Sequence, residues 1–159
     1  MNERHDVAHP TAARMAWRRL LGDHDRIASQ CAAIAALARR PGRHVETASI
    51  LLLELAIFVA DHMGVEDQVV DLTAAAIRSG ATPDDAAALA TEFDALKCDW
   101  TAFIVRWTRD AVAADWPGFA EAAEAMMPRL SAQVRREDEL LYAEALRRGI
   151  IQTGGLVLH

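Results

Sequence analysis

The sequence predicts an all-α protein that folds as an up-down-up-down four-helix bundle. Apolar residues recur at helical spacing over four long segments, and turn signals occur only between these segments. No segment alternates between polar and apolar residues over the length of a strand. Long helices with short connections pack antiparallel around one core, and 159 residues are enough for one such domain.

The first helix is expected over residues 11–40, after an N-terminal arm (residues 1–10) that we expect to be flexible. Thr11 is a suitable N-cap, and Pro41-Gly42 would stop the helix. His24 lies on the inward stripe of this helix, whose other members are apolar: Trp17, Leu20, Leu21, Ile27, Ala28, Cys31 and Ile34. The bundle itself is expected to span residues 11–148.

The second helix is expected over residues 45–79, with Gly80 closing it. His62 and Glu66 are four residues apart in this helix, so they lie one turn apart on one face. The rest of that face is apolar and includes Leu55, Phe58, Val59, Val65 and Val69. The imidazole and the carboxylate are therefore expected to point into the core.

Clear turn signals precede the third and fourth helices. Thr82-Pro83-Asp84-Asp85 combines an N-cap, a proline at the first helical position and acids in the first turn, so a helix is expected from there to about residue 114. The fourth helix is expected after residues 115–118 and as far as residue 148. Pro128 should kink or divide it, which could move the inward-facing Glu137 by a turn. Residues 149–159 form an apolar tail that could pack on the bundle or on a second subunit.

Composition and charge exclude several classes of function. A net charge of −6, without a cluster of Lys and Arg, argues against a nucleic-acid partner. The longest uninterrupted apolar runs, residues 50–53 and 55–60, are too short to span a bilayer, so we expect no membrane partner. The first ten residues do not have the apolar stretch of a signal peptide, and the two cysteines are not in a CxxC pair. We therefore expect a cytoplasmic protein.

Four ionisable side chains on inward faces are candidate metal ligands: His24, His62, Glu66 and Glu137. A divalent cation held by two neutral imidazoles and two carboxylates is formally neutral, which lowers the cost of burying the two acids. Mixed imidazole and carboxylate ligands suit Fe, Mn, Zn, Co or Ni better than Ca or Mg. The alternative is a metal-free core in which each glutamate is protonated or pairs with a histidine. Tyr142 is a candidate donor to the ligands.

Three segments, residues 21–27, 61–67 and 137–142, resemble the hemerythrin-like (HHE cation-binding) domain, and the resemblance extends over about residues 14–148. It implies a four-helix bundle with a non-haem diiron site, in which the histidines of each hairpin serve one iron and two carboxylates bridge. Where that family has its third- and fourth-helix histidines, this chain has Phe93 and Gln133. The resemblance thus implies one metal ion at the four candidate ligands, with iron expected before Zn, Mn, Ni or Co. Phe93 and Gln133 mark the positions of the second metal, which we expect to be vacant.

These observations predict a protein with a mononuclear non-haem site that senses or handles iron, oxygen or a related small molecule, such as a diatomic ligand. A metal-free bundle that serves as a protein-interaction or regulatory scaffold is the alternative. A homodimer through the apolar tail or an exposed helix face stays open in either case. An oxidase that uses non-haem iron is a third alternative, for which no substrate-binding motif is visible.

Overall fold

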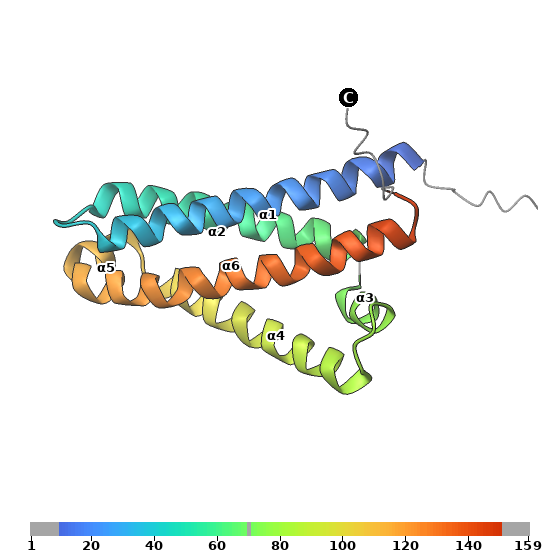
Figure 1. The fold of residues 1–159 in the computed structure, drawn as a ribbon. Coiled ribbons are helices and arrows are strands. Elements are labelled where there is room, and N and C mark those ends of the chain that lie inside the picture. The colour runs from blue at the N-terminus through green and yellow to red at the C-terminus, as the bar shows by residue number, and fades with distance from the viewer. Residues whose placement is uncertain (1–9, 70, 151–159) are drawn as a thin grey trace, which may run out of the picture.

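A computed structural model describes residues 10–69 and 71–150, which form six helices (Figure 1). The helices are α1 Pro10–Arg39, α2 Val45–Val69, α3 Leu72–Arg78, α4 Pro83–Arg106, α5 Arg109–Ala114 and α6 Trp116–Arg147. The four long helices, α1, α2, α4 and α6, alternate in direction, which confirms the predicted all-α bundle. The N-terminal arm up to residue 9 and the apolar tail from residue 151 lie outside the described residues.

Two of the predicted helices are divided, so the predictions of continuous helices over residues 45–79 and from Pro83 to about residue 114 are wrong. Asp71 starts α3, because its extended backbone leaves its carboxylate free to accept from the N–H of Ala74, 3.0 Å away. Thr108 starts α5 in the same way, with its hydroxyl accepting from the N–H of Ala111. Each side chain replaces a helical hydrogen bond at a new helix N-terminus.

Pro128 does not divide the last helix. The helix α6 runs without a break from Trp116 to Arg147, so a prediction of two separate pieces is wrong. Pro128 and Glu124, whose carbonyl loses its N–H partner, are both on the exposed side, where water can satisfy the carbonyl. Glu137 consequently keeps its place on the inward face.

The apolar core consists of two clusters with a polar layer between them. The larger cluster fills the end of the bundle that contains α5, and the smaller cluster joins α1, α3 and α6 at the other end. Along α1, Leu20 belongs to the smaller cluster and Ile27 to the larger one, with His24 between them. Ile150, the first apolar residue of the predicted tail, packs against the smaller cluster.

The helix α4 diverges from α6 towards its own N-terminal end, where α3 lies (Figure 1). A buried carboxylate, Glu144 of α6, secures α3 in that position. It accepts a hydrogen bond from Arg78 of α3 at 2.6 Å, and further ones from Arg147 and Arg148 of its own helix. The ion pair between Arg78 and Glu144 connects α3 to α6 on the side where α4 diverges.

The apolar character of α2 extends to its outer face. Residues Val45–Glu66 are long and apolar enough to cross a bilayer, although the uninterrupted apolar runs within them are short. In the most apolar stretch of 18 residues, 28% of the residues are buried. Length and apolar composition are weak evidence for a membrane span, since the core helix of a soluble protein can have both. Ile50, Leu53 and Ile57 are exposed on the outer face.

Candidate metal centre

The structure brings together all four side chains that the sequence suggested as ligands. His24 comes from α1, His62 and Glu66 from α2, and Glu137 from α6. Each residue is buried, with between 1% and 3% of its surface exposed, and each offers one nitrogen or oxygen within 4.8 Å of the others. Helical spacing aligns the two residues of α2, and bundle packing supplies the other two.

The distances between the donor atoms match those around a transition-metal ion. The Nε2 atom of His24 lies 3.0 Å from Nε2 of His62, 3.1 Å from Oε2 of Glu137 and 3.5 Å from Oε2 of Glu66. Oε2 of Glu66 is also 3.0 Å from Nε2 of His62. Ligand bonds of roughly 2.0–2.2 Å place neighbouring donors about 3.0 Å apart in octahedral geometry and about 3.4 Å apart in tetrahedral geometry.

Two aspartates hold the outer nitrogens of the histidine rings. Nδ1 of His24 lies 2.5 Å from Oδ1 of Asp138, and Nδ1 of His62 lies 3.2 Å from Oδ2 of Asp23. An acid at this place fixes the tautomer, because the ring must donate from Nδ1 and turn the Nε2 lone pair inward. Neither aspartate was predicted from the sequence, although each is adjacent to a candidate ligand within residues 21–27 or 137–142. Tyr142, suggested for such a role, is 51% exposed.

Without an ion, this cluster needs extra protons to satisfy its contacts. Nε2 of His24 faces one nitrogen and two carboxylate oxygens, and Nε2 of His62 faces a nitrogen and a carboxylate oxygen. If both Nδ1 atoms donate to aspartates, each Nε2 can donate to its carboxylate only when the ring is an imidazolium. Two imidazolium ions then balance two glutamates in charge, but their Nε2–H groups face each other at 3.0 Å. One divalent ion would balance the same charge and accept both Nε2 lone pairs.

The pKa values follow from this arrangement. Burial by itself lowers the pKa of His24, but its contacts with Glu137, Glu66 and Asp138 raise it to about 10. Burial likewise lowers the pKa of His62, and Glu66 and Asp23 raise it above its usual value. Burial raises the pKa of Glu66, but the two histidines lower it to about 2. Burial and the charge of Glu66 raise the pKa of Glu137.

Comparison with known proteins decides the family. Residues 15–145 match the family Hemerythrin, described as the hemerythrin HHE cation binding domain. The chain belongs to the hemerythrin HHE cation-binding family. No curated protein and no solved structure gives a significant match.

The donor set of this hemerythrin HHE domain fits a divalent transition-metal ion. Two neutral imidazoles and two carboxylates would leave the loaded cluster formally neutral, so the low-dielectric surroundings would not oppose binding. His24, His62, Glu66 and Glu137 would hold the ion, and Asp23 and Asp138 would orient the rings. An ion bound there supplies Lewis acidity and, if it is redox-active, an electron-transfer centre.

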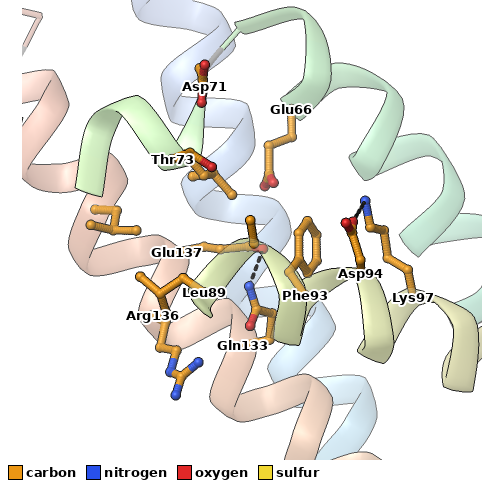
Figure 2. A pocket seen from close by; sticks show the side chains of 13 residues that line it. Glu66, Asp71, Thr73, Leu89, Phe93, Asp94, Lys97, Gln133, Arg136 and Glu137 are labelled. Atoms are coloured by element: carbon orange, nitrogen blue, oxygen red, sulfur yellow. Dashed lines mark hydrogen bonds and ion pairs between the residues drawn. The ribbon is translucent and has the colours of Figure 1, made fainter. Parts of the chain in front are cut away.

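Phe93 and Gln133 lie beside the two carboxylates (Figure 2). Gln133 donates from its amide to Oε1 of Glu137 at 3.0 Å, and Phe93 projects from α4. Both line a cavity of about 450 Å³ whose wall also includes Glu66 and Glu137. A phenyl ring and an amide are poor ligands, so these two residues add no strong ligand to the carboxylates that line the cavity.

Binding of a divalent ion is expected to release at least one proton near pH 7. The pKa of His24 is about 10 in the metal-free protein, so its Nε2 proton must leave before the nitrogen can bind an ion. The apparent affinity should rise about tenfold per pH unit for each proton released and level off above about pH 10. Calorimetric titration with Zn²⁺ in two buffers of different protonation enthalpy measures this release. Binding without net proton release would contradict the assigned protonation.

Proposed function

We propose that this protein binds one divalent transition-metal ion, iron first, at His24, His62, Glu66 and Glu137. Its role is to sense or handle iron, oxygen or a related small molecule. The observation that supports this proposal is the convergence of four buried donor atoms whose two imidazoles are each oriented by a carboxylate. The positions of Phe93 and Gln133 favour a mononuclear site over a diiron site.

The second candidate function is that of a metal-free regulatory or protein-interaction scaffold. One observation favours it: Nε2 of His62 lies 3.0 Å from Glu66 and Nε2 of His24 lies 3.1 Å from Glu137, so each imidazolium can donate to one glutamate and the two pairs balance in charge without an ion. In that case the raised pKa of His24 contributes to stability. The two candidates differ in whether the purified chain contains and needs a metal.

Elemental analysis of protein purified without chelator tests the proposal. We expect about one transition-metal ion per chain, and almost none in the double variant His62→Ala, Glu66→Ala, which removes half of the ligands. Ferrous or zinc ions at 100 times the dissociation constant should stabilise the metal-free wild type by about 2.7 kcal/mol. Thermal unfolding measures that gain.

The matched control is Glu54→Ala, which removes an exposed carboxylate from the same helix. It should leave the metal content unchanged. A wild-type protein without metal, whose melting temperature does not change with Fe²⁺ or Zn²⁺, would overturn metal binding. A value close to two ions per chain would overturn the mononuclear site only.

A further inference from the structure

We infer that the cavity beside Phe93 and Gln133 binds a small organic anion whose carboxylate reaches the metal ion. This inference rests on the proposed metal binding and adds the class of ligand that the ion takes. Three features of the cavity support it: its position beside the candidate ligands, the side chains that line it, and the ion pair that fixes α3 as one of its walls.

The cavity gives access to one side of the candidate centre. Its lining includes Glu66 and Glu137 but neither of the two histidines. His24 is enclosed between helices, and His62 borders only a smaller cavity of about 40 Å³. Asp138 and Asp23 hold the two rings from behind. An external ligand therefore meets the ion from the carboxylate side.

The size of the cavity favours an organic molecule over a diatomic gas. Its volume is about 450 Å³, within the range of roughly 300–1,000 Å³ that is typical of sites for small organic ligands. The apolar part of its wall comes mainly from α4 and α6 and consists of Leu72, Leu89, Ala90, Phe93 and Leu140. These residues can cover a ring or a short aliphatic chain.

Besides the two candidate ligands, the polar part of the wall contains two cations and two carboxylates, together with the amide of Gln133. Asp71 accepts from the N–H of Ala74, and Asp94 pairs with Lys97 at 3.1 Å. Gln133 uses one amide N–H on Glu137 and retains a second, while Lys97 has two further N–H groups. A carboxylate satisfies such donors, and its charge complements the ammonium group of Lys97.

Lys97 and Phe93 lie close together in the cavity wall, and both would contact the ligand. The ammonium nitrogen lies 4.6 Å from the centre of the phenyl ring, and its ion pair with Asp94 is exposed (Figure 2). An exposed ion pair contributes little to stability, so Lys97 can turn to an incoming anion at little cost. The ligand's acid group would lie between Gln133 and the ion, with its apolar body against Phe93.

The wall formed by α3 is held in place without the ligand. Leu72 and Thr73 at the start of α3 line the cavity, and Arg78 at its end pairs with the buried Glu144 of α6. A cavity that is already formed costs the ligand little ordering free energy.

Titration of Co²⁺-loaded protein with benzoate tests this inference. The visible absorption bands of Co²⁺ report a change among its ligands directly. We expect benzoate to change them with saturation, and neutral benzamide to leave them unchanged. Ala90→Trp, which fills the cavity from α4, should weaken benzoate binding at least tenfold and leave the affinity for Co²⁺ unchanged. Lys97→Gln should weaken benzoate binding several-fold.

The control variant is Ala95→Trp, which adds the same side chain to an exposed position of α4 that does not line the cavity. It should bind benzoate as the wild type does. Failure to bind Co²⁺ would overturn the proposed function and this inference with it. Binding of Co²⁺ with no spectral response to benzoate, or equal benzoate affinity in Ala90→Trp and wild type, would overturn this inference alone.

Discussion

The metal-free variant His24→Phe is expected to unfold at a temperature roughly 6–20 °C below that of the wild type. Phenylalanine keeps a planar, somewhat larger ring in the core but removes the cation that faces Glu137 and Glu66 at 3.1 and 3.5 Å. Breaking a buried ion pair on one side costs about 3–5 kcal/mol, and each kcal/mol is worth roughly 2–4 °C in a chain of this size. Thermal unfolding in the presence of a chelator measures the loss.

A second substitution distinguishes lost charge balance from lost packing. In His24→Phe, Glu137 keeps only the Gln133 amide, whereas Glu66 keeps His62. The double variant His24→Phe, Glu137→Leu removes the carboxylate left without a cation, so it should recover most of the lost stability. If the single variant were as stable as the wild type, the two buried carboxylates would not need the positive charge of His24.

Stability should also depend on pH in the metal-free wild type. The folded-state pKa of His24, about 10, lies above its unfolded value of 6.5, so its contribution is complete below pH 6.5 and is lost as the pH rises through 10. His24→Phe should therefore reduce the fall in melting temperature between pH 7 and pH 10.

Asp138→Asn is expected to lower the affinity for a divalent ion by about 10- to 100-fold. The aspartate lies 2.5 Å from Nδ1 of His24 and is the group that directs the lone pair of Nε2 inward. Asparagine retains an acceptor oxygen but no charge, so the imidazole becomes a weaker and less well oriented ligand. Competition with a chromophoric chelator for Zn²⁺ measures the affinity.

Asp23→Asn should have a similar effect through His62, since Asp23 occupies the equivalent place at 3.2 Å. Asp25→Asn is the matched control, because Asp25 is exposed on the same helix as His24. It should leave the affinity unchanged. Equal affinities in Asp138→Asn and Asp25→Asn would show that the outer carboxylate does not support the site.

The four-helix bundle could be predicted because hydrophobic periodicity over twenty or more residues is a strong signal. The breaks at Asp71 and Thr108 were missed, because each depends on one capping hydrogen bond, not on a change of period. The opposite error occurred at Pro128. Because proline cannot donate a helical hydrogen bond, Pro128 was expected to kink or divide the last helix, but the packing of α6 along its whole length keeps the helix undivided.

The sequence by itself determined the four long helices and the polar residues that face inward on three of them. Helical spacing gave the pair His62 and Glu66, because residues four apart share a face whatever surrounds them. Only the tertiary structure decided that His24 and Glu137 meet that pair, and that Asp23 and Asp138 stand behind the imidazoles. The divergence of α4, which leaves the cavity open beside Phe93, is also a tertiary feature (Figures 1 and 2). The physical reason is the same in each case: contacts between helices depend on their relative rotation and tilt, which periodicity within one helix does not specify.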